Sequence, residues 1–83
     1  MNYIAYLHKE EKSDFGVSFP DFPGCISAGK TVDEAKRNAA EALVFHIKGM
    51  KEDGEKIPAP SQMGDLSNDP DRAGAETFVV NVE

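Results

Sequence analysis

Residues 19–25 read Phe-Pro-Asp-Phe-Pro-Gly-Cys, and residues 31–35 follow as Thr-Val-Asp-Glu-Ala. Proline has no backbone N–H to give to a sheet, so the two prolines end the strand that leads into the first stretch. The glycine lets the chain reverse there. The Thr-x-x-Glu pattern of the second stretch fits a capping box, in which both side chains satisfy backbone amides at a helix start. The two stretches therefore predict a strand, a tight turn, a short strand and a helix in close succession.

Alternation of side chains predicts strands on both sides of this turn and at the end of the chain. Residues 2–10 alternate with apolar side chains in both sets, as expected of a strand in the centre of a sheet. Residues 15–19 place three large apolar side chains on one face, and these two strands form a hairpin. Residues 25–28 form the short third strand, and residues 77–82 alternate as the last one.

Apolar residues between the third and last strands recur at steps of three and four, which predicts an amphipathic helix from Val32 to about Gly49. Its inward positions are Val32, Ala35, Ala39, Leu43, His46 and Met50. Its outward positions are Arg37, Glu41, Val44 and Lys48. The chain is thus predicted to be one α+β domain, residues 1–83, with the order β-β-β-α-β and one helix packed on one face of a four-stranded mixed sheet.

Residues 51–76 are rich in Gly, Pro, Asp and Ser and form an unusually long loop for so small a domain. Its expected attachment points are Ile57, Met63 and Leu66. Because one helix covers only one face of the sheet, the other face is expected to stay open and to need a homo-oligomer or a partner. The residues expected on that face are either Ile4, Tyr6 and Val79 or the residues that alternate with them on the opposite face.

Nine basic and fifteen acidic residues give the chain a formal net charge of −6. Nucleic-acid binding needs clustered Lys and Arg, so DNA binding by this chain alone is not expected. The acidic balance fits a basic protein partner or serves solubility alone. Cys25 is the only cysteine, which excludes an internal disulfide and a cysteine-based zinc site. No stretch resembles a signal peptide or reaches transmembrane length, so the cytoplasm is the expected location.

The pattern of chemically reactive residues does not favour an enzyme. A nuclease needs carboxylates that converge on divalent metal ions, whereas the acids here lie mostly at turns and on the outer helix face. His46 lies on the apolar helix stripe, which is typical of a core or interface histidine. Cys25 is interpreted as a buried, inert thiol, with a nucleophilic pairing left open. We expect no catalytic residue, no metal site and no cofactor.

Two acidic residues have both a structural and a functional interpretation. Asp21 either caps its turn by accepting backbone hydrogen bonds or presents a carboxylate, with the neighbouring Phe22, to a partner. Glu41 is either solvated on the outer helix face or meets a positively charged group of a basic partner.

Several segments together resemble the N-terminal domain of HicB-type antitoxins. They are residues 3–5, 16–25, 28–35, 38–39, 42–43, 57–61 and 78–83. The resemblance implies a partial ribonuclease H-like fold and a non-enzymatic role in a type II toxin–antitoxin system. It also implies a partner, a small basic HicA-type toxin that has a double-stranded-RNA-binding fold and cleaves messenger RNA with a histidine. The antitoxin covers the active surface of that toxin.

With this partner in mind, the residues predicted to bind the toxin are Asp21, Phe22, Glu34, Arg37 and Glu41. Family members usually continue into a DNA-binding segment, whereas this sequence ends at residue 83, so no C-terminal DNA-binding domain is expected in it. Two alternatives stay open at this point. One is a residual metal-dependent nuclease on the ribonuclease H-like scaffold, and the other is a stand-alone oligomeric domain without a toxin.

Overall fold

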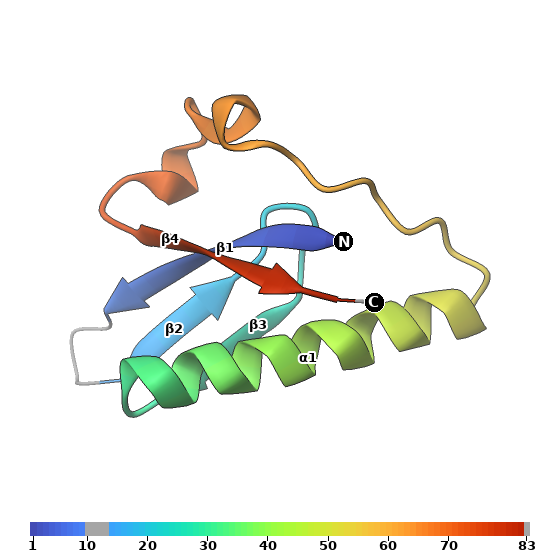
Figure 1. Ribbon diagram of the computed structural model, residues 1–83, viewed down its shortest axis with the longest axis horizontal. Helices are drawn as coiled ribbons and strands as arrows, with labels where there is room; N and C mark the ends of the chain where they lie inside the picture. The colour runs from blue at the N-terminus through green and yellow to red at the C-terminus, as the bar shows by residue number, and fades with distance from the viewer. Residues whose placement is uncertain (10–13, 83) are drawn as a thin grey trace.

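The computed structural model describes residues 1–9 and 14–82 and shows one four-stranded sheet with a single long helix on one face (Figure 1). The elements are β1 (Asn2–Lys9), β2 (Phe15–Ser18), β3 (Ile26–Gly29), α1 (Val32–Glu52), the 3-10 helices η1 (Met63–Leu66) and η2 (Pro70–Arg72), and β4 (Glu76–Asn81). The strands lie in the order β3-β2-β1-β4, so β1 is central as predicted. The predicted α+β class and β-β-β-α-β order are confirmed; residue 10 of the expected first strand lies outside the described residues.

The sheet is antiparallel throughout, and the prediction of a mixed sheet was wrong. Both neighbours of β1, which are β2 and β4, pair with it antiparallel, and β3 pairs antiparallel with β2. The reason is the length of the segment after α1. Residues 53–75, which we call the strap, carry the chain back to the end of the sheet where α1 begins (Figure 1). β4 therefore runs in the same direction as α1 and opposite to β1.

Helix α1 begins where the capping pattern predicts and ends later than expected. The Thr31 hydroxyl accepts a hydrogen bond from the Glu34 amide at 3.0 Å, and a Glu34 carboxylate oxygen accepts from the Lys30 amide at 3.3 Å. Gly49 stays helical, and the chain leaves the helix through Gly54, whose φ of 74° is left-handed. In the described part of the chain, no helix is both long and apolar enough to cross a membrane.

The main core lies between the sheet and α1. The buried helix residues are Ala35, Ala39, Leu43 and Ile47, so Ile47 takes the inward place that the sequence pattern gave to His46. A close approach fixes the distance between α1 and β3, because a Cβ atom on Gly29 would lie 2.4 Å from the Ala35 nitrogen. Small residues on both elements therefore allow the helix to rest almost directly on the strand.

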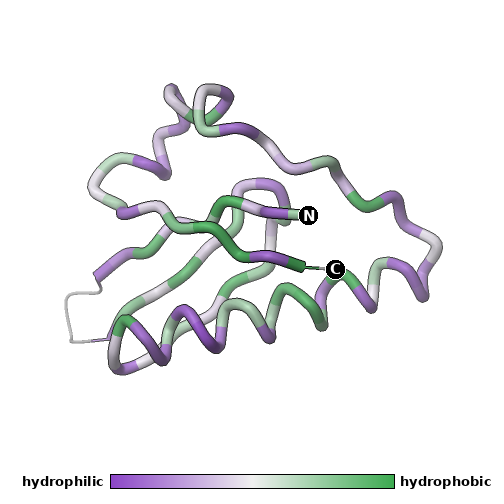
Figure 2. The backbone as a smooth tube through the Cα atoms, in the orientation of Figure 1, coloured by the Kyte–Doolittle hydropathy of each residue, from purple (hydrophilic) through white to green (hydrophobic). Residues whose placement is uncertain are grey.

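The strap covers part of the second sheet face. Leu66 of η1 packs on Ile4 and Tyr6 and forms a second small core, while Val79 of β4 stays 57% exposed. The expectation that this whole face is open was therefore wrong for Ile4 and Tyr6. The strap supplies the cover that the sequence analysis assigned to a second protein molecule. Figure 2 shows short hydrophobic stretches within a largely hydrophilic strap.

Polar contacts fasten the strap along its length. The Tyr3 hydroxyl donates to the Pro58 carbonyl at 2.6 Å, and the Tyr6 hydroxyl donates to an Asp69 carboxylate oxygen at 3.0 Å. Of the three predicted attachment points, Leu66 is buried and Ile57 packs against the main core, whereas Met63 is exposed. The strap is thus held by hydrogen bonds as much as by apolar burial.

The close approach of β3 and α1 predicts opposite effects for one substitution at two glycines. Gly29→Ala should lower the free energy of unfolding by about 1–3 kcal/mol, because the new methyl group meets backbone atoms of Glu34 and Ala35 that cannot move aside. Gly49→Ala is the control, since a Cβ there meets nothing within 4 Å, and it should raise stability by about 1 kcal/mol through helix propensity. Urea unfolding measures both, and equal effects would contradict this packing.

The contact between Tyr6 and Asp69 predicts a loss of stability at high pH. Burial, together with the hydrogen bond to Asp69, raises the pKa of Tyr6 to about 12 from the ordinary 10.0. The folded state holds the proton of the Tyr6 phenol more tightly than the unfolded state does. The protonated phenol therefore contributes its full share of the folding stability below pH 10, and this share is lost as the pH rises through 12. Denaturant unfolding of the wild type should show this decline, and Tyr6→Phe should flatten it.

The same comparison controls for the other tyrosine. Burial, and to a lesser degree the negative charge of Asp21, raises the pKa of Tyr3 as well. Tyr3 is present in both proteins, so the difference between their pH profiles isolates Tyr6. Identical profiles above pH 10 would show that the Tyr6 phenol contributes nothing to holding the strap.

Candidate functional site

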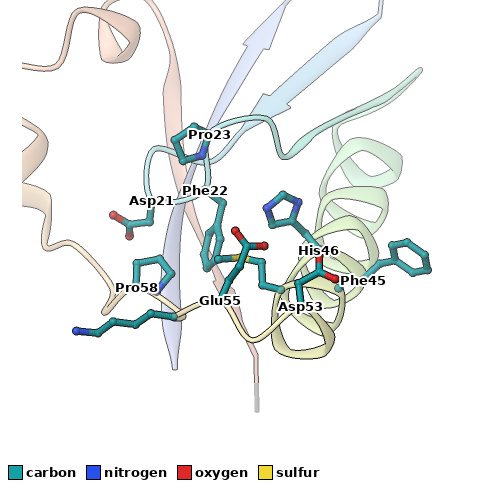
Figure 3. A pocket seen from close by; sticks show the side chains of 11 residues that line it. Asp21, Phe22, Pro23, Phe45, His46, Asp53, Glu55 and Pro58 are labelled. Carbon is teal, nitrogen blue, oxygen red and sulfur yellow. The ribbon is translucent and has the colours of Figure 1, made fainter.

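Two adjoining hollows lie along one side of α1. The turn hollow lies between the β2–β3 turn, the C-terminal half of α1 and the start of the strap, and Figure 3 shows the side chains around it. Residues that line it include Asp21, Phe22, Phe45, His46, Asp53 and Glu55. The edge hollow lies between β3 and α1 and is lined by Ile26, Ser27, Asn38, Glu41, Ala42 and Phe45, among others. Phe45 and His46 line both, so the two hollows form one continuous surface, which we call the acidic groove.

The β2–β3 turn is built by two successive backbone hydrogen bonds. The Phe22 amide donates to the Phe19 carbonyl at 3.1 Å, and the Cys25 amide donates to the Phe22 carbonyl at 3.0 Å. Gly24 has a φ of 89°, which a residue with a side chain rarely adopts. Phe19, Phe22 and Cys25 are all buried in the main core. Their burial holds the turn rigid and leaves Asp21 at the rim of the acidic groove.

Asp21 anchors the strap. Its two carboxylate oxygens accept from Ser61, one from the backbone amide at 2.8 Å and the other from the hydroxyl at 2.5 Å. The prediction that Asp21 caps its own turn was wrong, because the amide that its carboxylate accepts from belongs to the strap and lies 40 residues away in sequence. The same carboxylate lines the turn hollow, so it also contributes negative charge to the groove.

Phe22 is not presented to a partner, which corrects the expectation for its side chain. Its ring is buried and meets the Tyr3 ring edge-on at 4.8 Å and the His46 ring edge-on at 5.8 Å, measured between ring centroids. Burying an apolar side chain as large as phenylalanine is more favourable than leaving it exposed to solvent. Phe22 therefore shapes the floor of the turn hollow, and His46, half-buried against it, lines both hollows.

The exposed aromatic of this region is Phe45, which sequence reasoning missed. It is 79% exposed and projects from α1 away from the core (Figure 3). Its neighbour Val44 is also exposed. A shallow hollow beside the two residues is lined by Ala40, Glu41, Val44, Phe45 and Lys48. The signal in the sequence was available, because a phenylalanine lies off the helical stripe of Ala39 and Leu43, where a polar residue is expected.

The structure brings only some of the predicted site residues together. Asp21, Phe22 and Glu41 line the acidic groove. Glu34 lies at the first turn of α1 and holds the Lys30 amide, outside the groove. Arg37 is exposed one turn before Glu41, a spacing that places both on one helix face.

The groove carries an excess of negative charge around its exposed aromatic. Its carboxylates come from Asp21, Glu41, Asp53 and Glu55, and its lining also includes Lys56. An apolar centre with a predominantly negative rim is suited to binding a positively charged surface. The groove can therefore hold a basic protein surface without any chemical step.

Two kinds of reactive group that the sequence analysis considered are a metal-binding cluster and the Cys25 thiol. Within residues 1–9 and 14–82, no three His, Cys, Asp or Glu side chains gather closely enough to hold a metal ion. Cys25 is buried, and this burial raises the pKa of its thiol, which keeps it in the protonated, unreactive form. The interpretation of Cys25 as a core residue is thus confirmed.

Comparison with known proteins places this chain in a family. The family model described as "HicB_like antitoxin of bacterial toxin-antitoxin system" matches residues 3–83, and the chain belongs to this family. A 14.9 kDa protein from the rep–hol intergenic region of Haemophilus phage HP1 is 46% identical over 67 residues, which are 81% of this chain and 50% of that protein. The chain spans about half the length of several curated relatives that it matches.

Solved structures of HicB antitoxins have the same fold. The N-terminal domain of Burkholderia pseudomallei antitoxin HicB matches with a TM-score of 0.88 at 37% identity, covering 100% of this chain and 99% of that one. A chain of a HicA3–HicB3 toxin–antitoxin complex matches with a TM-score of 0.83 at 29% identity, covering 100% and 99%. The resemblance seen in the sequence is thus confirmed for both the family and the fold.

The double hydrogen bond from Ser61 predicts that Asp21 stabilises the fold. Asp21→Ala should lower the free energy of unfolding by about 1–3 kcal/mol, because it leaves the part-buried Ser61 amide without its charged acceptor. Ser61→Ala keeps the hydrogen bond from the residue 61 backbone amide to Asp21 and should lower the free energy of unfolding by less. In the double variant the losses should not add, since both changes remove the same contact. Urea unfolding measures the cycle, and additive losses would contradict the contact.

Proposed function

We propose that this chain is an antitoxin that binds and neutralises a small basic HicA-type toxin that cleaves messenger RNA. The observation that carries the proposal is the solved HicA3–HicB3 complex, in which one chain shares this fold over its whole length. The family match over residues 3–83 supports the same role. Because the target of such a toxin is messenger RNA, we place the interaction in the cytoplasm.

The acidic groove is the surface we assign to the toxin. Strong interface contacts are often exposed aromatic side chains with charged residues around them. A partner that covers the aromatic ring excludes water from the ring and from the surrounding charges. We propose that Phe45 is the apolar anchor and that Glu41 and Asp21 attract basic side chains of the toxin. Phe22 supports the groove from beneath, Glu34 fixes the start of α1, and Arg37 flanks Glu41 at the border of the contact.

The proposed neutralisation is steric and electrostatic, with no reaction carried out by this chain. Occupying the RNA-binding face of the toxin suffices to keep messenger RNA away from it. We also propose that residues 1–83 act as one domain and that their charge of −6 disfavours operator DNA as a ligand of this part. Homo-oligomer formation stays a prediction, with the exposed Val79 on edge strand β4 as its remaining structural support.

Substitutions in the groove should weaken toxin binding without unfolding the chain. Phe45→Ala should reduce affinity by about 30-fold or more, as for a central aromatic anchor, while changing stability by no more than about 0.5 kcal/mol. Glu41→Lys should also reduce the affinity for the toxin, because the new positive charge repels a basic partner. Val79→Ala and Glu76→Lys are matched controls, since both residues are exposed on β4 at the far edge of the sheet.

Calorimetric titration measures these affinities, with a small basic HicA-type protein from a neighbouring reading frame as the probe, inactivated by replacing its catalytic histidine. Wild-type affinity in both groove variants would remove the groove from the interface. Weakened binding only in the β4 controls would move the interface to the opposite edge. Failure of the wild type to bind this protein would overturn the proposed function itself.

A further inference from the structure

Strand β3 ends the sheet on one side, and its outer edge faces the acidic groove. Among residues 1–9 and 14–82, β3 pairs with β2 alone. The Asn38 side chain of α1 donates to the Ala28 carbonyl at 2.9 Å, which shows that the backbone groups of Ala28 point away from β2. Backbone direction repeats every second residue in an antiparallel pair, so the N–H and C=O of Ile26 point outward too. The Ser27 amide points to β2.

The walls beside this edge suit an incoming strand. On the α1 side, the edge hollow is lined by Asn38, Glu41, Ala42 and Phe45. On the opposite face of the sheet, Ile26 pairs with Ser18 across the strands and is 73% exposed. Edge strands are usually protected by proline, charge or a bulge. β3 has the sequence Ile-Ser-Ala-Gly and carries neither proline nor charge.

We propose that an extended basic segment of the toxin adds to β3 as a fifth strand, with main-chain hydrogen bonds to both backbone groups of Ile26 and to the Ala28 amide. The Ala28 carbonyl keeps its hydrogen bond from Asn38. This inference rests on the proposed function and specifies how the partner is recognised. Alternate side chains of the added strand fall on the two faces of the sheet. One set lies against Ala42 and Phe45 within reach of Glu41, and the other set lies beside Ile26.

Charge selects a basic toxin segment over a second copy of this chain. The acidic groove carries the carboxylates of Asp21, Glu41, Asp53 and Glu55, and includes Lys56. Pairing of two β3 edges would bring two such grooves together, and like charges in juxtaposition are unfavourable. A basic segment instead gains from the same charges. Main-chain pairing supplies affinity that does not depend on the partner's sequence, while Phe45 and Glu41 supply selectivity.

Hydrogen exchange resolved by residue tests the pairing directly. The probe is the same inactivated HicA-type protein that the calorimetric titration uses. On complex formation, exchange of the Ile26 and Ala28 amides should slow by about 100-fold or more, because both become hydrogen-bonded. The Ser27 amide is the internal control, since it already points to β2 and should change far less. A complex that forms while Ile26 and Ala28 exchange as before would overturn strand addition and leave toxin binding intact.

A substitution pair tests the same edge by affinity. Ile26→Pro removes the outward N–H, a change that edge strands tolerate, and should weaken toxin binding by about tenfold or more. Ile26→Thr keeps the donor and the β-branched shape and should bind within about threefold of wild type. Equal affinity of the two variants would overturn the proposal, and the exchange experiment on the wild type decides it if Ile26→Pro does not fold.

Two further outcomes separate the possible failures. If the chain alone shows slow exchange at Ile26 and Ala28 that increases with its own concentration, a second copy occupies the edge and the proposal is overturned. If no complex forms with the toxin, the proposed function fails together with this inference.

Discussion

The burial of Phe22 is the constraint on which the rest of the structure depends. Its ring joins three parts of the molecule, because it sits in the β2–β3 turn and meets Tyr3 of β1 and His46 of α1. Aromatic pairs of this geometry contribute about 0.5–1.5 kcal/mol each beyond the burial of their surface. Once Phe22 is in place, Asp21 must lie at the rim and β3 must start beside α1. The same residue thus fixes the core and the outline of the acidic groove.

The strap covers part of the second sheet face, opposite α1. Leu66 covers Ile4 and Tyr6, and the hydrogen bond between Tyr6 and Asp69 holds that cover in place. A domain this small has few ways to bury a second sheet face, and it does so here with its own chain. Phe45 and the β3 edge stay open beside the carboxylates of the acidic groove, whereas Val79 stays exposed on the other edge strand, β4. We assign the toxin to the first of these two surfaces because of its negative charge.

Local patterns in the sequence were sufficient for the elements but not for long-range contacts. The capping pattern at residues 31–34 and the alternation in the strands depend on near neighbours, so both could be predicted. The direction of β4 and the cover over Tyr6 depend on where the strap runs. The amino-acid composition of the strap does not determine its course over the sheet, so neither feature could be predicted. Asp21 shows the same limit. Its turn was predictable, whereas its partner Ser61 is 40 residues away.

Of the four carboxylates in the acidic groove, the sequence predicted those of Asp21 and Glu41 and missed those of Asp53 and Glu55, and it also missed Phe45. Glu41 faces outward, as helix periodicity requires, and Phe22 was misjudged because a turn residue was assumed to be exposed. Titration of toxin-catalysed messenger RNA cleavage with this chain tests the central claim, that the chain neutralises its partner by occupying a surface. We expect cleavage to fall to background as the chain reaches equimolar amounts. Cleavage that continues at full rate in the presence of excess chain would contradict the account.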